Sequence, residues 1–146
     1  MAKLTILAAC EKVIVDRQGL PSLISIFQRI NVPMQKEPFP ENALVPFPWV
    51  IFALWQHTDD ELNKDFIQHT EVITPDGKMF AKMQTKFKIT EADDRQSKNH
   101  IVVNGIPVWA EGFITVNVWL EGFEDDKVDY KFFVTYLKQP SEDTGS

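Results

Sequence analysis

The chain has little cysteine, little glycine and no long apolar run, and each shortage excludes a class of protein. Its single cysteine, Cys10, allows no disulfide within the chain, which agrees with a reducing compartment. Its six glycines are not clustered, so no phosphate-binding glycine loop is present. No apolar segment approaches the roughly 20 residues of a membrane-spanning helix. We therefore expect a cytoplasmic protein without a membrane partner.

Basic charge is also scarce, with 15 Lys and Arg against 21 Asp and Glu and a net charge of −6. Binding to nucleic acid through phosphates needs a concentrated basic face. The closest approach to one is Lys82, Lys86 and Lys88, which alternate along a single stretch. Such spacing is typical of the solvent-exposed face of a strand, where lysines oppose pairing of a sheet edge with another chain. No nucleic-acid partner is predicted.

The sequence shows no catalytic machinery. A G-x-S-x-G turn is absent, and the three histidines lack the spacing of zinc ligands. His69 and Glu71 are two residues apart in an expected strand and so face the same way, which would make them an acid–base pair if buried. The alternative turns Phe66 and Val72 inward and leaves both polar residues in water, and we favour it. We predict no enzyme, no catalytic residue, no metal site and no cofactor.

Short runs of β-branched and aromatic residues, separated by turn residues, recur along the chain and predict an all-β fold. At 146 residues the chain suits one domain, expected over residues 1–139 as an eight-stranded antiparallel β-sandwich. The polar segment 140–146 is expected to be a disordered tail. The eight strands are expected at residues 3–16, 23–32, 49–57, 66–74, 79–90, 100–108, 112–121 and 127–138.

Two connections stand out between these strands. Pro75-Asp76-Gly77 suits a hairpin built from a type I turn and a left-handed glycine. Five of the nine prolines fall between Pro33 and Pro48, which predicts a long, stiff arch that crosses from one sheet to the other.

The last two strands predict an interaction surface. Placing Leu120 opposite Val128 gathers the apolar residues of both strands on one inward face. The outward face then carries aromatic residues interleaved with polar ones, which is unusual for a monomer. We expect this face to bind another copy of the chain or another protein, through Phe113, Thr115, Trp119, Lys131 and Phe133.

The strand at 49–57 is apolar on both faces, with Trp49 and Ile51 on one and Val50 and Phe52 on the other. A sheet that is apolar on both sides needs a cover on both sides. Either the proline-rich arch, with Phe39 and Phe47, or another subunit would supply it.

Acidic residues gather in alternate loops, which share one end of the sandwich if successive strands run in opposite directions. Such carboxylates could bind Ca²⁺, steer a basic partner, or simply be solvated loop residues, and we favour the last. The residues of this acidic pole are Asp59, Asp60, Glu61, Asp93, Asp94, Asp125 and Asp126.

The order of elements resembles a family of small bacterial β-sandwich proteins classed as a domain of unknown function. The similarity rests on Leu4-Thr5-Ile6-Leu7-Ala8, on Leu23 to Ile30, on Pro75-Asp76-Gly77-Lys78 and on the stretches after Glu111 and Tyr130. It covers nearly the whole chain, although each motif is structural and weak. The resemblance implies an immunoglobulin-like or macroglobulin-like sandwich and carries over no functional residue.

These patterns together predict a non-enzymatic binding or interaction module that self-associates through its outward aromatic face. The alternative is a sandwich that binds a ligand or Ca²⁺ at its acidic pole.

Overall fold

The computed structural model describes residues 2–34, 43–56, 62–91 and 95–138, and within these ranges the chain is almost entirely β-strand. None of the described segments is a helix long and apolar enough to cross a membrane. One short 3-10 helix, η2 (Glu124–Asp126), precedes the last strand. The strands of the described part are β1 (Lys3–Val15), β2 (Pro21–Ile26), β3 (Arg29–Met34), β4 (Leu44–Gln56), β5 (Asp65–Ile73), β6 (Met79–Lys88), β7 (Gln96–Pro107), β8 (Gly112–Leu120) and β9 (Val128–Lys138).

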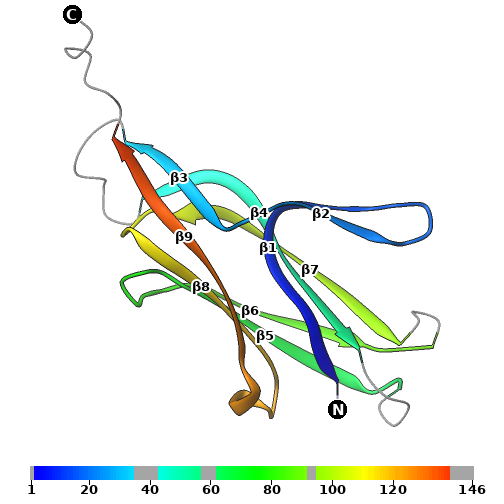
Figure 1. The fold of residues 1–146 in the computed structure, drawn as a ribbon. Coiled ribbons are helices and arrows are strands. Elements are labelled where there is room, and N and C mark those ends of the chain that lie inside the picture. The colour runs from blue at the N-terminus through cyan, green and yellow to red at the C-terminus, as the bar shows by residue number, and fades with distance from the viewer. Residues whose placement is uncertain (1, 35–42, 57–61, 92–94, 139–146) are drawn as a thin grey trace, which may run out of the picture.

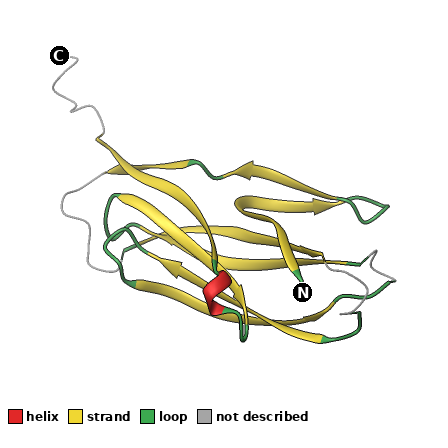
Figure 2. Cartoon of the chain, turned by 60° about the horizontal axis from the view of Figure 1, so that its bottom comes forward, coloured by secondary structure: helices red, strands yellow, loops and turns green. Residues whose placement is uncertain are grey.

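The strands form two sheets that pack against each other (Figures 1 and 2). Sheet A has the order β2-β1-β4-β7, and sheet B has the order β3-β9-β8-β5-β6. The predicted all-β fold with two packed sheets is confirmed. β6, which carries the alternating lysines Lys82, Lys86 and Lys88, is an edge strand of sheet B with these side chains exposed. Lysines at such an edge oppose pairing with another chain.

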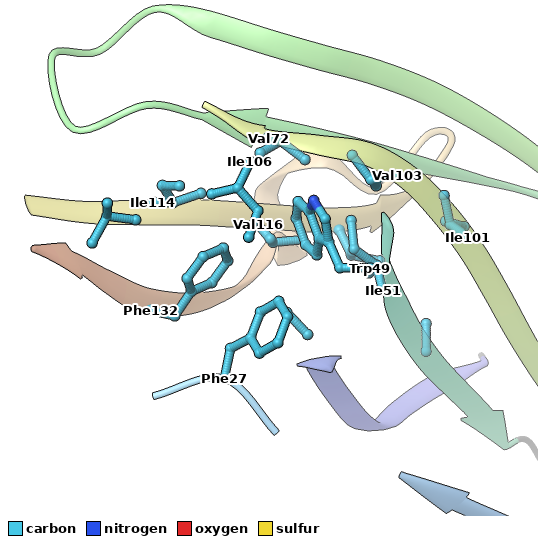
Figure 3. Close-up of a cluster of buried hydrophobic side chains, with 14 of the residues drawn as sticks. Phe27, Trp49, Ile51, Val72, Ile101, Val103, Ile106, Ile114, Val116 and Phe132 are labelled. Atoms are coloured by element: carbon cyan, nitrogen blue, oxygen red, sulfur yellow. The ribbon is translucent and has the colours of Figure 1, made fainter. Parts of the chain in front are cut away.

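Apolar side chains from both sheets fill the space between them (Figure 3). Phe132 of β9 meets Phe27 and Trp49 edge-to-face, with ring centroids 5.3 and 5.4 Å apart. The buried indole of Trp49 donates a hydrogen bond of 2.8 Å from Nε1 to the carbonyl oxygen of Gly105, which satisfies its polar atom. This aromatic cluster joins β4 of sheet A to β9 of sheet B.

The strand expected at 23–32 is two strands, so the eight-strand prediction is wrong for the described residues. The chain leaves sheet A after β2 and enters sheet B as β3, crossing at Phe27. Two backbone hydrogen bonds fix the crossing, one from Phe27 N to Ala9 O (2.8 Å) and one from Phe133 N to Gln28 O (2.9 Å). β3 then pairs with β9 in parallel, so the expectation of a purely antiparallel sandwich is also wrong.

The hairpin between β5 and β6 confirms the predicted turn. Gly77 has φ +83°, a left-handed conformation that glycine adopts without steric cost. Its amide donates to Thr74 O (2.9 Å), and Thr74 N donates to Lys78 O (2.9 Å). The Thr74 hydroxyl also hydrogen-bonds the Asp76 carboxylate, and this bond lowers the pKa of that carboxyl.

The proline-rich segment does connect the two sheets, because β3 lies in sheet B and β4 in sheet A. Pro33 lies in β3, and Pro46 and Pro48 lie in β4 rather than in the connection. A register shift between Val45 and Pro48 lets β4 keep its pairing with β7 around these prolines. The rest of the predicted arch lies outside the described residues.

The pairing of β8 with β9 differs from the prediction by two residues. Val118, not Leu120, lies opposite Val128. A two-residue shift keeps every side chain on its expected face, because side chains alternate with a period of two. The predicted inward set of β8 is accordingly buried, from Ile114 to Leu120 at alternate positions.

Candidate interaction surface

The outward face of sheet B carries the residues predicted to form an interaction surface. Phe113 of β8 lies directly across from Phe133 of β9, and their rings meet edge-to-face at 5.2 Å. Arg29 of β3 is the next residue in the same row, and its guanidinium lies 5.1 Å from the centre of the Phe133 ring. The Phe113 side of this aromatic cluster is open, because 55% of that residue is exposed. Thr115 and Lys131 form the next row.

Trp119 points outward as predicted but is only 6% exposed. Its ring lies flat on that of His69, with centroids 5.2 Å apart and an interplanar angle of 10°. Lys127 Nζ lies 4.3 Å from the centre of the indole, as in a cation–π contact. Trp119 is therefore covered by its own neighbours and is not part of the open aromatic surface, which corrects the expectation from the sequence.

His69 and Glu71 point away from the core, while Phe66 and Val72 pack against or within it. The sequence favoured this orientation, but it also predicted that His69 would be exposed to solvent, and His69 is buried. The stacked indole buries it, and its Nε2 lies 3.4 Å from Oε1 of Glu121. Glu71 instead lies across from Lys82 and Asn117. The two residues do not form the acid–base pair considered above, and neither His69 Nδ1 nor Trp119 Nε1 has a hydrogen-bond partner among the described residues.

A buried polar network in the core was not expected from the sequence. Gln68 Oε1 accepts hydrogen bonds from Trp55 Nε1 (2.7 Å) and Asn99 Nδ2 (2.8 Å), and Gln68 Nε2 donates to Thr70 Oγ1 (3.0 Å). Gln68 and Thr70 belong to sheet B, whereas Trp55 and Asn99 belong to sheet A. The sequence signal that could have predicted this network is the placement of Gln68 and Thr70 at inward positions of the strand, between Phe66 and Val72. The network satisfies its polar atoms and joins the sheets, so its role is structural.

Most of the acidic pole falls outside the described residues, including Asp59, Asp60, Glu61, Asp93 and Asp94. Asp125 and Asp126 lie on η2, whose side chains are all exposed. Within the part of the chain that the structure describes, no three His, Cys, Asp or Glu side chains are grouped closely enough to hold a metal ion.

Other carboxylates near this end have local partners. Asp16 Oδ1 accepts hydrogen bonds from the amides of Gln18 (2.8 Å) and Leu20 (2.9 Å), and so holds the β1–β2 turn. Asp65 lies 3.7 Å from Lys88 Nζ, and Glu91 lies 3.5 Å from Arg95. These carboxylates are occupied in turns and surface ion pairs.

We expect millimolar Ca²⁺ to leave the melting temperature unchanged. A cation that bound the folded chain would raise the melting temperature by mass action. Ca²⁺ needs 6–8 oxygen ligands, and no three carboxylates are grouped closely enough within the described residues to begin such a site. Thermal unfolding with and without 5 mM Ca²⁺, with Mg²⁺ as the control ion, measures this. A rise specific to Ca²⁺ that disappears in the double variant Asp125→Asn, Asp126→Asn would show that the pole is a calcium site.

The outer face of β4 is buried at Phe52 and partly exposed at Val50 and Leu54. Phe52 is only 1% exposed, and its neighbours Ala8 and Cys10 are also buried. The tip of the β1–β2 hairpin meets β7 on this side, where Lys98 Nζ donates to Gly19 O (2.8 Å). Phe47 packs on the inner face against Phe27 instead, with ring centroids 6.3 Å apart. Phe39 lies outside the described residues.

Cys10 is a free, buried thiol. Burial raises the pKa of this thiol, which keeps it protonated and unreactive at neutral pH. Cys10 is therefore a small core residue, as the apolar run around it indicated.

Comparison with known proteins assigns no family to the chain: no family model matches it, and no curated protein is significantly similar to it. The resemblance to the bacterial sandwich family stays a prediction.

Proposed function

We propose that the chain is a non-enzymatic interaction module that self-associates through the outward face of sheet B. The observation that carries this proposal is the open aromatic cluster of Phe113, Phe133 and Arg29. Aromatic residues and arginine dominate the binding energy of protein interfaces. Phe113 lies near the start of β8 with 55% of its surface exposed, beside Phe133, and is therefore a candidate anchor.

The rest of the face supports the same proposal. The side chains that β8 turns outward are uncharged, whereas the other strands of the face contribute Glu71 from β5, Asp129 and Lys131 from β9, and Lys82 from β6. An uncharged strand with charged residues on both sides agrees with an interface whose apolar centre is bordered by polar residues. Two-fold association would bury the patch against its own copy, and about 800 Å² per partner makes a stable interface.

Replacing Phe113 by aspartate tests the proposal. We expect the unmodified chain to be a dimer and Phe113→Asp to raise its dissociation constant about 30-fold, since loss of an anchor residue costs about 2 kcal/mol or more. Sedimentation equilibrium across a range of concentrations measures this. The matched control is Val102→Asp, because Val102 is 63% exposed on the opposite sheet and should leave the constant unchanged. A mass equal to one chain at every concentration would contradict the proposal.

We further propose that the fold is an immunoglobulin-type sandwich of a cytoplasmic protein. The strand order supports the fold assignment, since β4 and β7 pair in one sheet and β5, β8 and β9 pair in the other. This matches the BE and CFG pairings of immunoglobulin domains, with β6 in the position of the strand added in variable domains. The free thiol of Cys10 suits a reducing compartment.

A further inference from the structure

The side of the sandwich between β1 and β9 has two strand edges without a partner. β2 pairs with β1 only from Cys10 onward, so among the described residues no strand pairs with the β2 side of residues 3–8. β3 pairs with β9 only from Phe133 onward, so the same holds for the β3 side of residues 128–132. Figure 1 shows the two segments next to each other, below the point where the chain crosses between the sheets.

A cavity of about 440 Å³ lies in this opening. Leu4, Trp55 and Leu120 line its apolar interior, and Phe123 and Val128 line it from the side of η2 and β9. Phe123 and Val128 are exposed large hydrophobic residues. The volume is within the range of small-ligand sites, and the cavity is large enough for a bulky apolar side chain.

The upper end of the opening is closed by the chain that crosses between the sheets. Phe27 N donates to Ala9 O, and the hydroxyl of Tyr130 donates to Phe27 O at 2.6 Å. The six residues 3–8 of the free β1 edge therefore offer about 20 Å of unpaired backbone, at about 3.3 Å per residue. That length equals one ordinary strand.

The lower end of the opening is acidic. Glu124, Asp125 and Asp126 make up η2, which holds no basic residue, and Asp126 itself lines the cavity. Lys3 is the basic residue among the lining side chains. A partner with a basic residue next to an apolar one would place opposite charges together at this end.

We propose that this opening binds an extended, basic peptide segment of another protein. The segment adds a strand to the free edge of β1, inserts a large apolar side chain against Trp55 and Leu120, and sets a Lys or Arg beside η2. Main-chain hydrogen bonds supply the affinity in this mode of recognition, and the pocket supplies the specificity. The site lies apart from the outward face of sheet B, so peptide binding can be tested independently of self-association.

Selection from a displayed library of random twelve-residue peptides tests the proposal. The library is panned on the unmodified chain and on Val128→Lys, which changes an exposed residue at the cavity, adds a charge that repels a basic peptide and should not affect folding. We expect enrichment of peptides that alternate apolar residues and contain Lys or Arg, with at least tenfold weaker binding to Val128→Lys. The control Val102→Lys should bind like the unmodified chain, and so should Phe113→Asp. The lack of an enriched peptide, or equal binding to Val128→Lys, would overturn the proposal.

Two further measurements test strand addition itself. The best selected peptide should protect from hydrogen exchange those amides of residues 3–8 that point away from β4, and methylation of its alternate backbone nitrogens should abolish binding. Equal binding of the methylated peptide, or protection confined to residues 128–132, would overturn the assignment to the β1 edge.

Discussion

Phe132→Ala is expected to lower the free energy of unfolding by about 3–5 kcal/mol, as truncation of a fully buried aromatic side chain does. Phe132 is completely buried, and its ring contacts both Phe27 and Trp49. Its removal would open a cavity at the place where the aromatic cluster joins the two sheets. Urea unfolding followed by tryptophan fluorescence measures the loss.

The matched control is the neighbouring substitution Lys131→Ala. Lys131 points outward, and its ammonium lies 3.8 Å from the Asp129 carboxylate in an exposed pair. Such a pair contributes little, so this variant should cost under about 0.5 kcal/mol. Comparable losses for the two variants, or a larger loss for Lys131→Ala, would contradict the assigned faces of β9.

This contrast shows how much of the fold the sequence could predict. The alternation of residues in 112–138 specifies the face on which each side chain lies, and the structure agrees with these faces for β8 and β9. Burial follows them only in part, because Val128 on the inward face is exposed and Trp119 on the outward face is buried. The exact register was wrong by two residues because it depends on Gly122, with φ +88°, and on η2, and not on alternation. The crossing at Phe27 could not be predicted either. No glycine or proline interrupts the stretch from Leu23 to Ile30. It is divided by hydrogen bonds to Ala9 and Phe133, which are distant in sequence.

Gln68→Ala is expected to lower the free energy of unfolding by roughly 2–6 kcal/mol. The substitution would leave two buried donors, Trp55 Nε1 and Asn99 Nδ2, without their acceptor. Each unpaired buried group costs about 1–3 kcal/mol. Chemical denaturation of the variant measures the total.

Gln84→Ala serves as the control for this substitution. Gln84 is exposed on β6 and lies across from His69 in the sheet, so its truncation should cost under about 0.5 kcal/mol. If Gln68→Ala costs no more than Gln84→Ala, the buried network does not join the sheets as described.

The sequence predicts the candidate interaction surface only in part, because contacts between strands decide which of its side chains are exposed. Alternation correctly places Phe113, Trp119 and Phe133 on the outward face. It does not say which of them neighbouring side chains cover. Trp119 is buried because His69, on the adjacent strand, stacks on one ring face and Lys127 approaches the indole. Phe113 has no comparable cover at its end of the strand, so it remains exposed.

The parallel pair of β3 and β9 has a consequence for synthesis on the ribosome. Arg29 pairs with Phe133, about a hundred positions later, so β3 has no strand to join until the last strand has been made. During translation β3 therefore remains an unpaired segment of the nascent chain. Contacts this distant in sequence slow folding, and they make completion of sheet B a late event. An unpaired strand in a nascent chain is prone to aggregation, so chaperones that hold β3 during synthesis would increase the yield of folded protein.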